Sequence, residues 1–122
     1  MAEKLNEEIF AGFIAGSALP VLVDFYQDGC VPCRRVAPLL SKAETEYDGK
    51  ITVARVNLAQ NLELAEQYDI AAAPTLLLFR DGKEIARHRG VIDRDGLKAF
   101  VETVCDILPA ECEEKVINDR SV

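Results

Sequence analysis

The residues best suited to chemistry are two cysteines separated by two residues, Cys30-Val31-Pro32-Cys33. Pro32 fits the first turn of a helix, because the N–H that proline lacks would have no partner there. Cys30 would then occupy the helix N-terminus, where free N–H groups and the helix dipole stabilise a thiolate. A thiolate is the nucleophile of thiol–disulfide exchange. The spacing therefore predicts that Cys30 attacks a disulfide and that Cys33, one turn deeper, resolves the mixed disulfide.

Two other interpretations of this cysteine pair stay open from the residues alone. Such a pair can be half of a zinc site, which would need the two remaining cysteines, Cys105 and Cys112. Their spacing is long for that purpose, so no metal site is predicted. The pair could also be two inert cysteines. Cys105 is expected to be a small buried hydrophobe and Cys112 an exposed thiol, with a regulatory disulfide between them as the alternative.

Length and charge narrow the class of protein. The chain has 122 residues, of which 49% are apolar and 29% charged, and its formal net charge is −7. These values are typical of one soluble globular domain with its own core. An acidic surface repels phosphate backbones and anionic lipid, so neither nucleic acid nor a membrane is expected as a partner. The N-terminal residues lack the basic start and apolar run of a signal peptide, which predicts a cytoplasmic protein with reduced thiols.

Apolar periodicity and breaker residues predict an alternation of helices and strands. Asn6 and Asp93 are suited to capping helices, and Asp81-Gly82 indicates a hairpin turn. The expected helices, with their capping residues, run from Asn6 to Gly16, from Cys30 to about Tyr47, from Leu62 to Tyr68 and from Asp93 to Leu108. The expected strands cover residues 21–26, 51–56, 75–80 and 83–89. This order predicts an α/β domain over residues 1–108, with a parallel βαβ unit and a hairpin in one mixed sheet. Residues 109–122 are expected to form an acidic C-terminal tail.

From about Leu5 to Leu108 the chain resembles the thioredoxin family. The matching stretches are Val21-Leu22-Val23-Asp24-Phe25-Tyr26, Cys30-Val31-Pro32-Cys33, Ala73-Pro74-Thr75-Leu76-Leu77-Leu78-Phe79, Asp81-Gly82 and Gly90. The resemblance implies a thioredoxin fold, a central mixed β-sheet of four to five strands flanked by about four helices on both faces. It also implies a monomeric protein-disulfide reductase. Such a protein needs no cofactor beyond the Cys30–Cys33 disulfide, takes electrons from a thioredoxin reductase and passes them to client protein disulfides.

The resemblance assigns a role to a buried acid as well as to the two cysteines. Asp24 resembles the carboxylate that helps to move the proton of Cys33. A carboxylate inside an apolar strand is costly, so burial should raise the pKa of Asp24, and a nearby Arg55 would oppose that shift. The alternative is an Asp24 that faces water at the end of its strand.

A substrate-binding surface around the cysteines is also implied. Pro74 resembles a cis-proline that faces the active site, so that the backbone of Ala73 can pair with an extended substrate. Gly90 resembles the glycine that leaves room beside the cysteines, and Gly29, Val31 and Pro32 complete the surface. The alternatives are an ordinary trans proline at the start of a strand and a simple turn glycine.

The departures from the family pattern concern the surroundings of the cysteines. The family usually has Trp-Cys-Gly-Pro-Cys, whereas Gly29 and Val31 stand here at the tryptophan and glycine positions, and Arg55 stands where a lysine is usual. Because Gly29 removes a large contact surface, a binding or adaptor module with little redox turnover is the alternative function. An oxidant or isomerase of the same fold is a third possibility. His88, the only histidine, is expected to face solvent.

Overall fold

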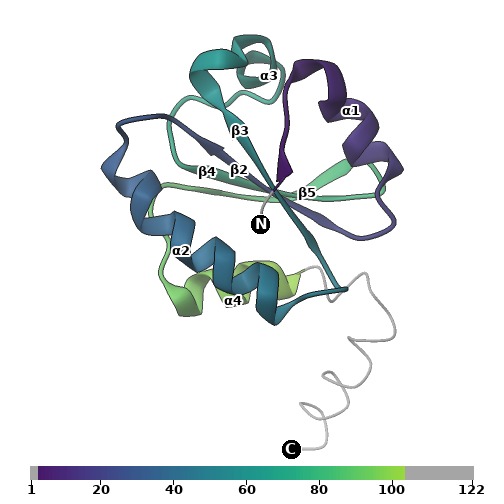
Figure 1. Cartoon of the computed structure of the whole chain (residues 1–122), viewed down its shortest axis with the longest axis vertical. Coiled ribbons are helices and arrows are strands. Elements are labelled where there is room, and N and C mark those ends of the chain that lie inside the picture. Colours follow the sequence, from purple (N-terminus) through teal and green to yellow (C-terminus); the bar gives the residue numbers. More distant parts are fainter. Residues whose placement is uncertain (1–2, 104–122) are drawn as a thin grey trace, which may run out of the picture.

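The fold is an alternation of short helices and strands around one sheet (Figure 1). A computed structural model describes residues 3–103 of the chain. The strands are β1 (Glu3–Lys4), β2 (Val21–Tyr26), β3 (Thr52–Asn57), β4 (Thr75–Arg80) and β5 (Lys83–Arg89). The helices are α1 (Glu7–Gly16), α2 (Val31–Glu46), the 3-10 turn η1 (Leu58–Gln60), α3 (Leu62–Gln67) and α4 (Arg94–Glu102).

The sheet is mixed and its strands lie in the order β1-β3-β2-β4-β5. The central strand β2 pairs in parallel with β3 and antiparallel with β4, and β4 pairs antiparallel with β5. The parallel βαβ unit β2-α2-β3 and the β4–β5 hairpin are therefore confirmed. Asp81 and Gly82 both have positive φ, 54° and 79°, which is the geometry that a tight two-residue hairpin turn requires.

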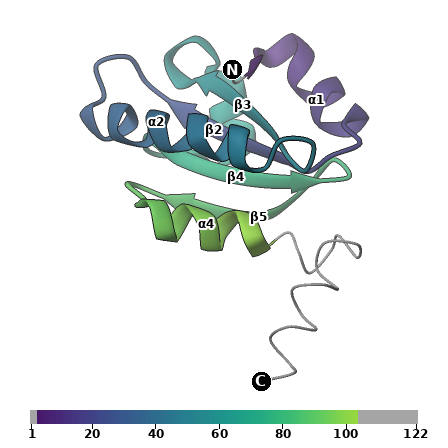
Figure 2. The same ribbon diagram turned by 60° about the horizontal axis from the view of Figure 1, so that its bottom comes forward.

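Helices cover both faces of the sheet. Figure 1 shows α1 and α3 on one side of the sheet and α2 and α4 on the other, and Figure 2 turns this second side toward the viewer. Successive residues of β2 point to opposite sides, because side chains alternate along a strand. Val21, Val23 and Phe25 join the core under α1 and α3, whereas Leu22 joins the core under α2 and α4. Asp24 lies two residues after Leu22 on the same strand and therefore faces the same side of the sheet, the side covered by α2.

One feature differs from the prediction. The two-residue strand β1, which pairs in parallel with β3, was not expected, and it makes the sheet five-stranded. Phe10 and Ile14 are the buried residues of α1, whereas Ile9 is 49% exposed. The predicted end of the last helix at Leu108 lies outside the described residues. No helix in the described part of the chain combines the length and apolarity needed to span a bilayer.

Candidate active site

Cys30 and Cys33 lie at the start of α2 and form a disulfide, with their Cα atoms 5.2 Å apart. Cys30 is the N-cap residue, and its Sγ accepts a hydrogen bond from the Cys33 N–H at 3.1 Å. Cys30 is partly exposed, whereas Cys33 is 2% exposed. The N–H bond and the positive end of the helix dipole both favour a negative charge on the Cys30 sulfur. The geometry thus presents one activated sulfur at the surface and keeps its partner beneath it.

The local sequence explains why the helix begins here. Pro32 occupies the first turn of α2, where its missing N–H leaves no bond unmade. Gly29 has φ +75°, in the left-handed region that favours glycine. A Cβ at Gly29 would meet no atom within 4 Å, so the backbone conformation, and not crowding, accounts for the glycine. In this loop a tryptophan at position 29 would be strained.

The loop before β4 brings a backbone carbonyl to the cysteines. The Ala73–Pro74 peptide bond is cis, as the resemblance implies, and Pro74 is buried. The carbonyl oxygen of Ala73 lies 3.9 Å from the Cys30 Sγ. In the disulfide that sulfur carries no proton, so the contact can become a hydrogen bond only when Cys30 is a thiol. Gly90 donates its N–H to the Pro74 carbonyl at 2.8 Å with φ +87°, a conformation that explains glycine at this position.

Asp24 is fully buried on β2, which excludes the alternative of a carboxylate facing water. Its Oδ2 accepts a hydrogen bond from the Arg55 Nε at 3.1 Å, and its Oδ1 has no partner among the described residues. Burial raises the pKa of Asp24 to about 6, and the charge and hydrogen bond of Arg55 oppose that rise. Both parts of the prediction for this pKa are confirmed. Arg55 sits opposite Asp24 in the β2–β3 register and stacks on the Tyr26 ring, 4.0 Å from its centroid.

A hollow beside the buried cysteine reaches Arg55, the partner of Asp24 in this ion pair. The hollow has a volume of about 240 Å³, and Cys33 and Arg55 both line it. Tyr26, Gln27, Asp28, Gly29, Arg34 and Ala37 complete its wall. The space is large enough for water. Arg34 and the stacking of Tyr26 on Arg55 were not singled out from the sequence, since nothing local in their spacing distinguishes them from ordinary surface residues.

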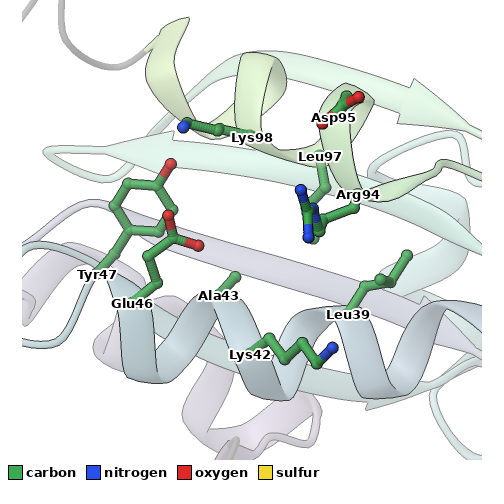
Figure 3. Close-up of a pocket in the computed structure, with 9 residues that line it drawn as sticks. All are labelled: Leu39, Lys42, Ala43, Glu46, Tyr47, Arg94, Asp95, Leu97 and Lys98. Atoms are coloured by element: carbon green, nitrogen blue, oxygen red, sulfur yellow. The ribbon is translucent and has the colours of Figure 1, made fainter.

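Another cleft, of about 360 Å³, lies between α2 and α4 (Figure 3). In Figure 3, Arg94 and Leu97 project from α4 toward α2, and Leu39 projects from α2 toward α4. None of the residues predicted to act in chemistry lines this cleft. It is therefore separate from the cysteine site.

The other residues considered for chemistry lie apart from the cysteine pair or outside the described residues. His88 is only partly exposed; its Nε2 lies 3.2 Å from the Val91 carbonyl oxygen, and its ring packs edge-on against Phe100. The prediction of a solvent-facing histidine was therefore only partly right. Cys105 and Cys112, on which the zinc alternative and a second disulfide depended, lie outside the described residues. Among residues 3–103 no group of three or more His, Cys, Asp or Glu side chains is placed to hold a metal ion.

The site defines a class of protein by its chemistry. A cysteine pair at a helix N-terminus can alternate between dithiol and disulfide, and the cysteines themselves then carry the electrons. That is the chemistry of a thiol–disulfide oxidoreductase, and the mixed sheet with helices on both faces is the framework of the thioredoxin fold.

Comparisons with known proteins identify the family. The family profile described as Thioredoxin matches residues 1–103. Thioredoxin 1 of Nostoc sp. is 36% identical over 101 residues, which are 83% of this chain and 94% of that protein. Thioredoxin C-2 of Corynebacterium nephridii is 35% identical over 97 residues, 80% of this chain and 90% of that one. Thioredoxin of Mycobacterium tuberculosis is 35% identical over 106 residues, 87% and 89% of the two chains.

The chain belongs to the thioredoxin family and is a thiol–disulfide oxidoreductase. Members of this family act on protein disulfides, are generally reduced by a thioredoxin reductase, and use no cofactor beyond their own disulfide. The two cysteines and the cis-proline loop predicted from the sequence lie together, and the buried acid is on a neighbouring strand with Arg55 as its partner.

Proposed function

We propose that the protein reduces client disulfides, with Cys30 as the attacking residue and Cys33 as the resolving residue. The observation that carries this assignment is the contrast between the two sulfurs. The Cys30 sulfur is partly exposed and accepts the Cys33 N–H at a helix N-terminus, whereas Cys33 is 2% exposed. A client can therefore reach Cys30, and the helix stabilises the thiolate that attacks.

The reaction balances within the two cysteines and the client. The Cys30 thiolate bonds to one client sulfur, and the other client sulfur leaves as a thiolate. Cys33 then loses its proton and attacks the Cys30 Sγ, which closes the Cys30–Cys33 disulfide and releases the second client thiolate. The client gains two electrons, and its two thiolates take up protons from solvent. The protein gives up two electrons and the one proton of Cys33, because Cys30 enters the reaction as a thiolate. A reductase then returns two electrons to the protein.

Asp24 accepts the proton of Cys33 in this proposal. A carboxylate with a pKa of about 6 is charged at neutral pH and is still basic enough to exchange a proton with a thiol. Cys33 and Arg55 line the same hollow, and Arg55 is bonded directly to the Asp24 carboxylate. Water in that hollow would therefore carry the proton from Cys33 toward Asp24. Arg55 keeps its own proton and acts as a fixed charge.

The client surface surrounds the exposed sulfur. Ala73 supplies backbone groups for an extended client, and its carbonyl oxygen lies 3.9 Å from the Cys30 Sγ. The hydrogen bond from the Gly90 N–H to the Pro74 carbonyl holds this part of the surface in place. Gly29, Val31 and Pro32 form the other side. Val31 is 51% exposed, an apolar contact that a client covers on binding.

The setting of the reaction follows from its chemistry. A protein that must return repeatedly to the dithiol works best in a reducing compartment, so we place it in the cytoplasm. It acts as a monomer and without a cofactor, because the groups of the reaction come from one chain. A thioredoxin reductase supplies the electrons. We assign residues 1–108 to the catalytic domain and residues 109–122 to an acidic tail.

Reduction of insulin disulfides by dithiothreitol tests the activity. The wild-type protein should accelerate precipitation of the insulin chains, and Cys30→Ser should return the rate to that of dithiothreitol alone, because the nucleophile is gone. Cys112→Ser serves as the matched control and should keep the wild-type rate. A wild-type protein without turnover would contradict the proposal and favour the binding module.

Trapping experiments test the division of roles. Cys33→Ser should accumulate a mixed disulfide between Cys30 and the client, because the resolving attack is absent. Cys30→Ser should trap almost none. Non-reducing electrophoresis with mass spectrometry of the linked peptides measures both. Equal trapping by the two variants would show that the roles are wrongly assigned.

A further inference from the structure

Arg87 on β5 reaches across to the loop that carries the cis-proline. Its Nη2 donates to the carbonyl oxygen of Tyr68 at 2.8 Å, and its Nη1 lies 3.3 Å from the carbonyl oxygen of Asp69. Tyr68 is the C-cap of α3, and Asp69 follows it. A guanidinium at this position bonds carbonyls that the ended helix leaves free, and its charge complements the negative end of the helix.

A carboxylate on the same strand holds Arg87 in place. Glu84 accepts from the Arg87 Nε at 2.7 Å through Oε2 and from Nη2 at 2.8 Å through Oε1. This two-point pairing fixes the plane of the guanidinium, so its remaining N–H groups point in a set direction. The side chains of Arg87 and Glu84 are 22% and 29% exposed. The pair is thus partly shielded from water, and its geometry is specific to an arginine.

The segment that Arg87 holds is a sharp reversal of the chain. Asp69 has φ +56°, a left-handed conformation that is uncommon for residues other than glycine. The N–H of Ile70 donates back to the Ala65 carbonyl at 2.7 Å, and Ile70 itself is 9% exposed, packed into the core under α1 and α3. The direction in which the chain leaves α3 is therefore set at these residues, four positions before Ala73.

Strand β5 and Gly90, the residue that follows it, anchor the two ends of the loop. Arg87 bonds the start of the loop through its side chain, and Gly90 bonds its end through the N–H donated to the Pro74 carbonyl. Ala71 and Ala72 are exposed between these two anchors. Ala73, which follows them, presents its carbonyl to Cys30.

We propose that Arg87 is a positioning residue that fixes the loop from Tyr68 to Pro74 and thereby holds the Ala73 backbone in register for an extended client. The inference rests on the proposed client surface. Arg87 touches neither the cysteines nor the client; it acts through the loop. Its loss should weaken client binding and leave the sulfur chemistry intact.

Hydrogen exchange and kinetics of Arg87→Met test this role. Methionine keeps the apolar stem of the side chain and removes the guanidinium. The Ile70 amide should exchange at least about tenfold faster, because charge-assisted bonds that hold its turn are lost, whereas the Leu77 amide in β4 should keep its wild-type rate. The KM for insulin should rise several-fold with kcat unchanged. Dithiothreitol should reduce the Cys30–Cys33 disulfide at the wild-type rate, since so small a reductant does not depend on pairing with the Ala73 backbone.

Lys83→Met is the matched control, because it removes one positive charge from the same strand without touching the loop. It should leave the Ile70 amide and the KM unchanged. Arg87→Lys keeps the charge but not the planar group that pairs at two points with Glu84. Its Ile70 exchange rate and its KM should lie between those of wild type and Arg87→Met. An unchanged Ile70 amide, an equal rise in KM in Lys83→Met, or a parallel loss of kcat and of the dithiothreitol rate would each overturn the proposal. If the wild type fails to reduce insulin, the proposed function fails, and the exchange rates still decide the role of Arg87.

Discussion

The two sides of the sheet are built differently. Under α1 and α3, the rings of Phe10, Phe25 and Phe79 are fully buried, and Tyr68 packs edge-on against Phe79 with their centroids 5.5 Å apart. Under α2 and α4, the fully buried apolar side chains are aliphatic, and Asp24 lies among them with an unpartnered oxygen. One side is therefore organised for packing, and the other side, which is covered by the helix that carries the cysteines, accepts a buried charge.

The difference shows how one strand serves both purposes. Alternate residues of β2 face opposite sides, so Val23 and Phe25 enter the aromatic core while Asp24 faces the redox site. Aromatic packing on the far side holds the strand in place. A charge with a raised pKa on the near side destabilises the native state, and it is tolerated because the opposite core supplies stability.

Truncating the aromatic core should give the largest effect on stability. Phe10 is 1% exposed, and its ring lies 5.4 to 6.1 Å from three other rings. Phe10→Ala should lower the free energy of unfolding by about 3 to 5 kcal/mol, because it removes buried surface and leaves a cavity. The activity per folded molecule should not change. Denaturant melts and insulin reduction below the transition measure the two quantities.

Ile9→Ala provides the control on the same helix. Ile9 is 49% exposed, so its truncation should change the free energy of unfolding by less than about 0.5 kcal/mol. If Phe10→Ala and Ile9→Ala had similar effects, the view that the aromatic side carries the packing would be wrong.

Replacing the buried charge should have an effect of opposite sign. The folded-state pKa of Asp24, about 6, lies above the ordinary aspartate value of 3.8, so the native state binds the proton more tightly than the unfolded chain. Native stability therefore falls as the pH rises from about 4 to about 6, and the penalty is complete above that range. Asp24→Asn removes this penalty and should be about 2.5 kcal/mol more stabilising at about pH 8 than at about pH 4. Denaturant melts at several pH values measure the difference.

The same variant should separate stability from activity. Without a proton acceptor for Cys33, Asp24→Asn should slow the resolving step at neutral pH while the fold gains stability. Asp48→Asn, in an exposed turn, is the control and should change stability by less than about 0.5 kcal/mol. A variant of Asp24 that destabilises the protein at every pH and keeps full turnover would contradict the assigned role.

A helix cap on the packing side should give the smallest effect. The Asn6 side chain accepts hydrogen bonds from the N–H groups of Glu8 and Ile9, at 2.9 and 3.1 Å. Asn6→Ala should lower the free energy of unfolding by about 1 kcal/mol, because these N–H groups lose their acceptor. Asn6→Asp keeps an acceptor and should stay near wild type. Thermal melts of the three proteins rank them, and equal losses in both variants would contradict a capping role.

Much of the fold was predictable because its signals are local. The apolar run of β2, the Asn6 cap and the positive-φ turn at Asp81-Gly82 each depend on a few adjacent residues. The spacing of Cys30 and Cys33 around Pro32 likewise indicated a helix N-terminus and its chemistry. The family resemblance then supplied the roles of Asp24 and Pro74, which spacing alone did not.

The sequence by itself determined the longer helices and strands and the cysteine chemistry, since periodicity, capping and turn preferences act between neighbours in the chain. Only the tertiary structure decided which distant groups meet. The two-residue strand β1 exists because β3 offers it an edge, and Arg87 meets the carbonyls of Tyr68 and Asp69 from 19 and 18 residues away. The same holds for the hollow shared by Cys33 and Arg55. Such contacts depend on how strands and helices pack, and sequence spacing does not encode that packing directly.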